Sequence, residues 1–400
     1  MTTLSPPVVL RPRRPRRVTP FMRLRTRYGN RPYPRTPSYV VVCATVGVLN
    51  IVGLVMILSA SSVAALSDYG SSWYFFDRQF MWAVVGIVAF LVASRVDYHL
   101  WRKLAPIALV AAFGLLFVVL VPGIGITVDG SRRWLGYGPM RLQPSEFAKI
   151  ALLVYAADVL ARRAAHLHDP RAWRPVMVVL GGIGALVMLE PDLDSTVVLA
   201  LIAFALLVLA GVPRRHLVNM ALVGVGLAVM LSFAAPYRRA RVFAFLHPSS
   251  DTSNTGYQIM QSLIALGSGG VNGVGLGAGR AKWMFLPNAH TDFIFAIVGE
   301  ELGFVGCLLV LGLFAGFGLV GFHVARRAPD LFGTLLAGGI TVWIAGQAAI
   351  NLGAVVGVLP VSGITLPFLS SGGSSLVIAM LAAGMLGNVA RQTPTRRPVR

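Results

Sequence analysis

The feature that most constrains this chain is a stretch of 60 residues, Leu331 to Ala390, that contains no Asp, Glu, Lys or Arg. A membrane-spanning helix needs about 20 consecutive apolar residues, so this stretch is long enough for two of them and a connection. We therefore expect two spans, joined by a re-entrant or surface loop around Leu359 to Ser371.

Other charge-free runs predict seven more spans. They are Ser38 to Ser67, Gln79 to Ser94, Leu104 to Val128, Pro175 to Leu189, Ser195 to Pro213, His216 to Tyr237 and Leu302 to Ala325. A further apolar helix, about Leu142 to Ala161, carries Glu146, Lys149 and Asp158 and brings the number to ten. With 56% hydrophobic and 12% charged residues, the chain has too little polar surface for a soluble domain. The expected fold is an all-α integral membrane protein of about ten transmembrane helices.

The distribution of basic residues predicts the orientation in the membrane. A formal net charge of +20 suggests nucleic acid at first, but in the ten-span arrangement 25 of the 35 Lys and Arg residues lie on one side. The positive-inside rule places that side, and both termini, in the cytoplasm, and no nucleic-acid partner is expected. The predicted parts are a basic, proline-rich disordered tail near anionic membrane lipids (1–37), a membrane domain (38–391) and a second basic tail (392–400).

Three segments on the predicted outer side have unusual content: 123–141, the large extracytoplasmic loop 236–291 between the seventh and eighth helices, and 353–373. Eight basic residues lie in the first two, against the usual bias: Arg132, Arg133, Arg141, Arg238, Arg239, Arg241, Arg280 and Lys282. This concentration favours an anionic ligand such as a diphosphate, which arginine binds in a bidentate manner. Attraction to lipid headgroups is the alternative.

Asp292 is the candidate catalytic residue. It lies where the polar loop meets an apolar segment, and the 40 residues between Asp251 and Asp292 contain no other acid. A lone carboxylate in a basic, partly dry environment is suited to act as a general base. No second carboxylate is obvious beside it, which favours direct displacement with inversion. The alternative is that Asp292 only caps the following helix.

Charged residues elsewhere in the spans allow further predictions. Glu146 and Lys149 lie three residues apart on one helical face, so each offsets part of the cost of burying the other. Such a pair could be purely structural or could line an active site. The acids of Glu190-Pro191-Asp192-Leu193-Asp194 are expected to cap a turn, with a cation site as the lesser alternative. The glycine-rich segment 267–277 lacks the context of a nucleotide-binding loop and is expected to allow tight turns and close backbone approach.

Several motifs together resemble the SEDS family of peptidoglycan glycosyltransferases, which contains the FtsW, RodA and SpoVE types. The matching segments are Gly130-Ser131-Arg132-Arg133-Trp134, Gln143-Pro144-Ser145-Glu146-Phe147-Ala148-Lys149, Pro191-Asp192-Leu193, Gly256-Tyr257-Gln258 with Gln261-Ser262, His290-Thr291-Asp292-Phe293-Ile294-Phe295, Gly299-Glu300-Glu301-Leu302-Gly303 and Leu359-Pro360 through Pro367-Phe368 to Ser370-Ser371-Gly372-Gly373-Ser374-Ser375. The family commonly has Gln-Pro-Asp-Leu-Gly at the fifth-span turn, so Glu190 and Asp194 depart from it and put a specific role for that turn in doubt.

The resemblance implies polymerisation of lipid II, an undecaprenyl-diphosphate-linked substrate, at the outer face of the cytoplasmic membrane. Asp292 would be the catalytic base. The residues implied in substrate binding are Arg132, Arg141, Glu146, Lys149, Gln258, Gln261, Lys282, His290, Ser370 and Ser374. The resemblance leaves open a role for a divalent cation, Mg²⁺ or Mn²⁺. It also implies partners, namely a class B penicillin-binding transpeptidase and other division proteins.

The motifs resemble the septal FtsW type more than the elongation-type RodA, and the basic tail resembles that of actinobacterial members. One alternative is a lipid II flippase, whose site would lie near the bilayer midplane rather than at the outer rim. Another is a scaffold without activity. Small residues in the eighth and ninth spans are a predicted docking face for the helix of a transpeptidase: Ala315, Gly318, Gly321, Gly338, Gly339 and Ala345.

Overall fold

A computed structural model describes residues 36–128, 131–138, 140–248, 255–283 and 285–393. Both predicted tails lie almost entirely outside these residues. The helices are α2 (Pro37–Tyr69), α3 (Tyr74–Arg95), α4 (Tyr98–Leu120), α5 (Pro144–Arg162), α6 (Pro170–Leu189), α7 (Leu193–Ala210), α8 (Arg214–Ala234), α9 (Pro236–Leu246), α10 (Thr255–Ser268), α11 (Ile294–Arg326), α12 (Leu331–Val355) and α13 (Gly373–Gln392), with a 3₁₀ turn at Ala164–His166.

Nine helices in the described part of the chain are long and apolar enough to cross a membrane. These are α2, α3, α4, α6, α7, α8, α11, α12 and α13. The tenth, α5, falls outside this group because it carries Glu146, Lys149, Asp158 and Arg162, yet most of its residues are buried among the other helices. The prediction of an all-α membrane protein with about ten spans is confirmed.

The connection between α12 and α13 runs from 356 to 372 without helix, as the sequence predicts. One predicted boundary is wrong. The apolar run Leu104 to Val128 does not form one long helix, because α4 ends at Leu120 and the chain turns into β1 (Ile126–Val128). This strand pairs antiparallel with β2 (Ser131–Tyr137), which pairs in turn with β3 (Met140–Leu142). The register places Leu135 opposite Leu142. Because β3 ends at Leu142 and α5 begins at Pro144, the strand leads directly into the helix.

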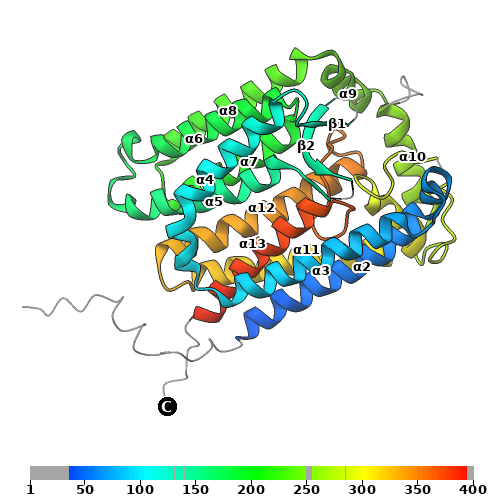
Figure 1. The fold of residues 1–400 in the computed structure, drawn as a ribbon, viewed down its shortest axis with the longest axis horizontal. Helices are drawn as coiled ribbons and strands as arrows, with labels where there is room; N and C mark the ends of the chain where they lie inside the picture. The colour runs from blue at the N-terminus through cyan, green and yellow to red at the C-terminus, as the bar shows by residue number, and fades with distance from the viewer. Residues whose placement is uncertain (1–35, 129–130, 139, 249–254, 284, 394–400) are drawn as a thin grey trace, which may run out of the picture. The chain divides into compact units, whose positions relative to one another are not determined.

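The start of α2 and the end of α13 lie at one end of the helix bundle, while the strands, α9 and α10 lie at the other (Figure 1). We call the second the hairpin end. The α9 and α10 helices fall within the predicted loop 236–291, which is therefore partly helical. The start of α5, which follows β3, and the start of α11, which follows Asp292, both belong to the hairpin end.

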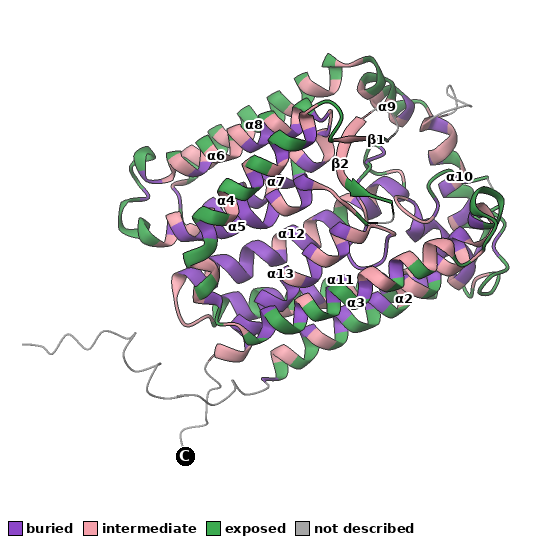
Figure 2. Cartoon of the chain, viewed as in Figure 1, coloured by how far each residue is buried: buried purple, intermediate pink, exposed green. Residues whose placement is uncertain are grey.

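Helices α5, α12 and α13 form the interior of the bundle, whereas α8 has no buried residue (Figure 2). Close packing in the interior depends on small residues. A Cβ atom added at Gly384 of α13 would lie 2.5 Å from the carbonyl oxygen of Phe90 in α3. The two helices approach closely because this position has no side chain.

The predicted docking face of small residues is wrong for most of its members, because they pack inside the chain. A Cβ atom at Gly321 of α11 would lie 2.1 Å from Thr341 Oγ1 of α12. The corresponding neighbours of Gly338 and Gly339 are Leu209 and Leu206 of α7. These glycines let α7, α11 and α12 pack together. Ala315, in contrast, is exposed on α11.

Candidate functional site

Asp292 lies two residues before α11 and is partly buried. The cap of this helix is Phe293, which makes no side-chain capping hydrogen bond, so the alternative in which Asp292 only caps α11 is wrong. Burial raises the pKa of the Asp292 carboxyl to about 7, an effect that Asp194 increases and Arg241 opposes. A carboxyl group with a pKa near 7 can exchange a proton at neutral pH.

The loop that carries Asp292 is held by hydrogen bonds to its backbone. Asn351 Nδ2 of α12 donates to the carbonyl oxygen of Asp292 at 2.9 Å. Ser370 Oγ donates to the carbonyl oxygen of Thr291 at 2.5 Å, and the Ser371 amide donates to that of His290 at 2.9 Å. The segment 356–372 and α12 therefore fix three consecutive residues through their backbone carbonyl groups.

His290, one of the predicted site residues, packs its imidazole against the ring of Phe75, with 4.4 Å between ring centroids. Burial lowers the pKa of this imidazole to about 4, so it is neutral at physiological pH. Ser370, also predicted, serves the backbone of the loop as described above. A neutral histidine and a buried serine position the segment and add no charge to it.

A second carboxylate lies beside Asp292, and the expectation of a lone acid is wrong. The Asp194 carboxylate is close enough to act electrostatically on Asp292. Its Oδ2 atom accepts a hydrogen bond from the Gly363 amide at 3.0 Å and lies 3.5 Å from Arg241 Nη1. No local pattern in the sequence indicates this contact, because Asp194, Arg241 and Asp292 come from three separate segments.

The predicted pair of Glu146 and Lys149 is present in the first turns of α5. Lys149 Nζ lies 2.8 Å from Glu146 Oε1, and both side chains are buried. The ammonium group also donates to Gln347 Oε1 of α12 at 3.3 Å, and Gln347 Nε2 donates to the carbonyl oxygen of Thr365 at 3.0 Å. The pair is thereby linked to the segment 356–372 that holds Asp292.

The β-strands bring two of the predicted arginines to the hairpin end. Arg132 lies on β2 and donates from Nη1 to the carbonyl oxygen of Leu120 at 3.1 Å. Arg141 lies on β3, next to the start of α5. The Nε atoms of both are buried without a hydrogen-bond partner in the described part of the chain. Each guanidinium group therefore keeps an N–H donor that the described residues do not use. Ser374, at the start of α13, accepts a hydrogen bond from the Gln143 amide at 3.2 Å and ties α13 to this region.

Lys282 lies apart from these arginines in a buried ion pair. Its Nζ atom lies 3.2 Å from Glu301 Oε1 of α11 and 3.2 Å from Ser59 Oγ of α2. This lysine is neutralised within the fold and anchors the loop before Asp292. Gln258 and Gln261 lie on α10 and are partly exposed. Within the described residues, neither glutamine is hydrogen bonded to the loop that carries Asp292.

The glycine-rich segment 267–277 packs against a break in α11, as the prediction of close backbone approach requires. Gly303 has φ 67° and ψ −164°, which interrupts the helix. The Gly275 amide donates to the carbonyl oxygen of Glu301 at 3.1 Å, and the Phe304 amide donates to that of Gly270 at 2.9 Å. A Cβ atom at Gly273 would lie 2.2 Å from the carbonyl oxygen of Glu301, so no larger residue fits there.

In the turn between α6 and α7, the prediction of capping acids holds for Asp192 and not for Glu190 or Asp194. Asp192 caps α7, and its carboxylate accepts hydrogen bonds from the Ser195 amide at 3.0 Å and from Gln143 Nε2 at 3.2 Å. Glu190 is fully buried, and burial raises its pKa to about 8, helped by the charge of Asp192. No group of three or more His, Cys, Asp or Glu side chains in the described residues is arranged to hold a metal ion.

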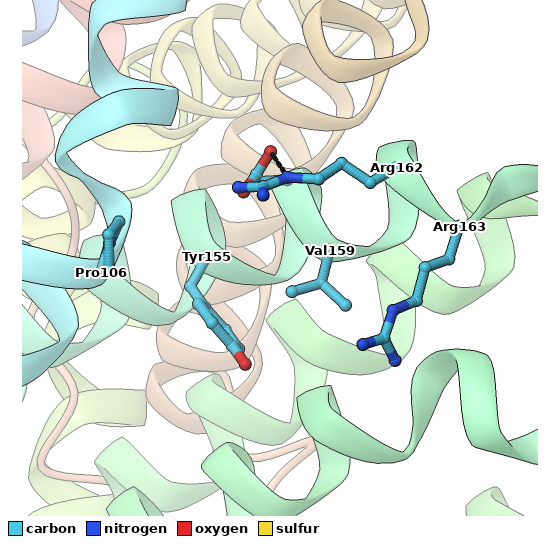
Figure 3. A pocket seen from close by; sticks show the side chains of 6 residues that line it. Pro106, Tyr155, Val159, Arg162 and Arg163 are labelled. Atoms are coloured by element: carbon cyan, nitrogen blue, oxygen red, sulfur yellow. Dashed lines mark hydrogen bonds and ion pairs between the residues drawn. The ribbon is translucent and has the colours of Figure 1, made fainter.

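A cavity of about 280 Å³ lies at the opposite end of α5 (Figure 3). It is lined by Pro106, Tyr155, Asp158, Val159, Arg162 and Arg163. Its acid, Asp158, is paired with Arg162 and also with Arg102, whose Nε lies 2.5 Å from Asp158 Oδ1. Along the axis of α5 this cavity is about 20 Å from Glu146, at 1.5 Å per residue, and it is separate from the site around Asp292.

Known proteins are similar to this chain in sequence and fold. The FtsW/RodA/SpoVE family, described as "Cell cycle protein", matches residues 39–395. The chain belongs to this family. "Stage V sporulation protein E" of Bacillus subtilis is 41% identical over 357 residues, which are 89% of this chain and 97% of that protein. "Probable peptidoglycan glycosyltransferase FtsW" of Mycobacterium tuberculosis is 40% identical over 373 residues, 93% of this chain and 71% of that protein.

Solved structures of FtsW/RodA/SpoVE proteins have the same fold. The rod shape determining protein RodA of Thermus thermophilus superposes with a TM-score of 0.65 at 26% identity, over 89% of this chain and 97% of that one. A chain from the structure "Structural coordination of polymerization and crosslinking by a peptidoglycan synthase complex" gives a TM-score of 0.71 at 28% identity, over 88% and 96%. The resemblance inferred from the sequence motifs is therefore confirmed for nearly the whole chain.

Proposed function

We propose that this protein is a peptidoglycan glycosyltransferase that polymerises lipid II into glycan strands at the outer face of the cytoplasmic membrane. Its relatives with 40% identity or more include proteins named as peptidoglycan glycosyltransferases. The observation that carries the proposal is Asp292, a partly buried carboxyl group with a pKa of about 7 on a loop fixed by its backbone.

The proposed reaction assigns a role to this carboxylate. The 4-hydroxyl of the acceptor sugar attacks the anomeric carbon of the donor, and its proton passes to Asp292. A new bond forms between that oxygen and the anomeric carbon, while the bond from this carbon to the diphosphate oxygen breaks. The undecaprenyl diphosphate leaves with the bonding electrons. We propose inversion at the anomeric carbon, since Asp194 is held by Gly363 and Arg241 and not placed as a nucleophile.

The leaving diphosphate needs positive charge or hydrogen-bond donors, and Arg141 and Arg132 are suited to supply them. Each has a buried Nε atom without a partner in the described residues. Lys149 is paired with Glu146, so it contributes to the site through this pair and through Gln347. A divalent cation would add the same kind of stabilisation.

The position of the charged groups favours an enzyme over a flippase. Glu146 and Lys149 occupy the first turns of α5, a helix of 19 residues, and Asp292 lies just before α11 begins. All three are at the ends of helices, whereas transporters bind their substrates near the bilayer midplane. The proposed orientation has the hairpin end outside and both termini in the cytoplasm, as the distribution of basic residues predicts.

We further propose a septal role in cell division and a class B penicillin-binding transpeptidase as the partner. The support is the naming of relatives as FtsW and the similarity to a chain of a peptidoglycan synthase complex. A polymerase of uncrosslinked strands needs a crosslinking enzyme close by. We also propose other division proteins and membrane lipids as partners.

The decisive experiment compares purified wild-type protein with Asp292→Asn, using lipid II as substrate and gel analysis of the glycan product. The substitution keeps the size of the side chain and removes the base, so polymerisation should fall by roughly 10²- to 10⁴-fold. Asp77→Asn is the matched control, because Asp77 is an exposed acid near the start of α3. Normal polymerisation by Asp292→Asn would refute the mechanism. Translocation of labelled lipid II without polymer would favour the flippase.

A further inference from the structure

The Asp194 carboxylate joins three segments of the hairpin end. Asp194 itself lies in the first turn of α7. Its Oδ2 atom accepts a hydrogen bond from the Gly363 amide, at 3.0 Å, in the segment between α12 and α13. The same atom lies 3.5 Å from Nη1 of Arg241, which belongs to α9. A single carboxylate oxygen therefore holds α9 and the 356–372 segment against the start of α7.

The backbone of Asp292 is linked through Asn351 to the same segment, 356–372. Asn351 Nδ2 donates to the carbonyl oxygen of Asp292 at 2.9 Å and to that of Ile364 at 2.8 Å. Asp194 thus holds the backbone at Gly363, and Asn351 links the following residue, Ile364, to the backbone of Asp292. The two carboxylates are brought together by two consecutive residues of one loop.

Other charged groups near Asp292 are already neutral or paired. His290, on the same loop, is neutral because burial lowers its pKa to about 4. On α11, Glu300 accepts hydrogen bonds from the Arg280 and Ala281 amides, and Glu301 is paired with Lys282. The span from α12 to α13 contains no Asp, Glu, Lys or Arg before Arg391. Among the described residues, Asp194 and Arg241 are the charged groups that act on Asp292.

We propose that Asp194 and Arg241 are positioning residues for the base Asp292: they hold the turn at Gly363 and helix α9 beside it, and they set its charge environment with one negative and one positive group. This inference rests on the proposed glycosyltransferase function. It also assigns a role to position 194, where the family commonly has glycine and where the sequence alone left any role in doubt.

The two groups act on the base in opposite directions. The pKa of the Asp292 carboxyl lies at about 7, because burial and the charge of Asp194 raise it while Arg241 lowers it. Without Arg241, a larger fraction of Asp292 would be protonated at neutral pH and unable to accept a proton. Without Asp194, Asp292 would be ionised at lower pH but would be a weaker base. The pair keeps the base both ionised and sufficiently basic near pH 7.

The test is the pH dependence of lipid II polymerisation by the purified full-length protein. Asp194→Asn removes the negative charge and keeps an oxygen that can accept from Gly363, so the acid limb of the profile should move down by roughly one pH unit. Arg241→Gln removes the positive charge, so the limb should move up by about the same amount. Asp194→Glu and Arg241→Lys keep the charges and should leave the limb in place.

Three further variants complete the design. The double variant Asp194→Asn with Arg241→Gln should return the limb close to its wild-type position, since it removes both charges. Asp77→Asn and Arg215→Gln change the net charge at exposed positions and are the controls. Since Arg241 lies on a surface helix, Arg241→Gln tests the proposal even if Asp194→Asn does not fold.

The proposal is overturned if the acid limb of the pH profile stays in place in both Asp194→Asn and Arg241→Gln, or if it moves in the same direction in both. The outcome is separable from failure of the proposed function. If Asp292→Asn polymerises as well as wild type, the base assignment itself fails. If Asp292→Asn is inactive but the acid limb stays in place in Asp194→Asn and Arg241→Gln, only the positioning role of Asp194 and Arg241 fails.

Discussion

The side-chain nitrogen of Asn351 lies 2.9 Å from the backbone oxygen of Asp292 and donates a hydrogen bond to it. The second hydrogen of the same nitrogen is donated to Ile364, at 2.8 Å. Asn351 is almost completely buried within α12, the helix at the interior of the bundle. The position of the proposed base is therefore set by a rigid helix, although Asp292 itself lies on a loop.

Asn351→Ala should impair both stability and activity. The substitution leaves two backbone carbonyl groups without their donor, and an unsatisfied buried group costs about 1–3 kcal/mol. We expect a lower melting temperature in detergent and a fall in polymerisation of about tenfold or more, because the base loses its fixed position. Asn219→Ala, at an exposed position of α8, is the control and should match wild type in both assays. Unchanged polymerisation by Asn351→Ala would mean that the loop is held by its other contacts.

The wild-type enzyme should lose activity as the pH falls below about 7, the pKa of Asp292. The sign follows from the role of the group, since only the ionised carboxylate accepts a proton. Below this pKa the ionised fraction decreases about tenfold per pH unit, and the rate should follow it. His290, with its pKa of about 4, does not titrate in this range. A rate that stays constant from neutral pH down to pH 5 would contradict the assignment of Asp292 as the base.

The spans could be predicted because each is an apolar run of about 20 residues, and this property is local. The exception, the run ending at Val128, illustrates the limit of the method. Residues 121–128 are apolar enough for a helix, but they form a turn and β1, which pairs with β2. Hydrophobicity does not distinguish these states, since strand pairing depends on a segment further along the chain.

The site was predictable where a motif carries it and not where it depends on tertiary contacts. Asp292 and the Glu146–Lys149 pair follow from short segments of sequence. The contacts of Asp194 and Asn351 cannot be predicted from local sequence, because their partners are far away in the chain. Asp194 moreover departs from the common family motif. Local sequence predicts that Lys282 belongs with the outward cations, since nothing local indicates its buried pairing with Glu301.

Lys149→Met tests whether the buried pair on α5 has a role beyond structure. Removing the ammonium group leaves Glu146 buried without its counter-ion, which costs roughly 3–5 kcal/mol unless the carboxyl group becomes protonated. We expect lower thermal stability and reduced polymerisation. The double variant Glu146→Gln with Lys149→Met removes the stranded charge and should recover stability. If polymerisation stays low in this stable double variant, the pair contributes to the site, whereas recovery of both would make it purely structural.

The glycines of α11 separate helix packing from partner binding. Gly321→Ala places a Cβ atom 2.1 Å from Thr341 Oγ1, so α11 and α12 must move apart and the melting temperature should fall. Gly312 lies on the same helix but is exposed, with nothing within 4 Å of an added Cβ atom. Gly312→Leu and Ala315→Leu should therefore leave the fold and basal polymerisation intact.

If the proposed transpeptidase docks its single helix on this exposed side of α11, the same two leucine variants should reduce its co-purification, since bulky side chains prevent close helix approach. Gly321→Ala should change co-purification only in proportion to the loss of folded protein, because its contact is internal. Size-exclusion chromatography of each variant, expressed together with the transpeptidase, measures both quantities. Undiminished complex formation by Gly312→Leu and Ala315→Leu would place the interface on another helix, and α8, which has no buried residue, would be the next to test.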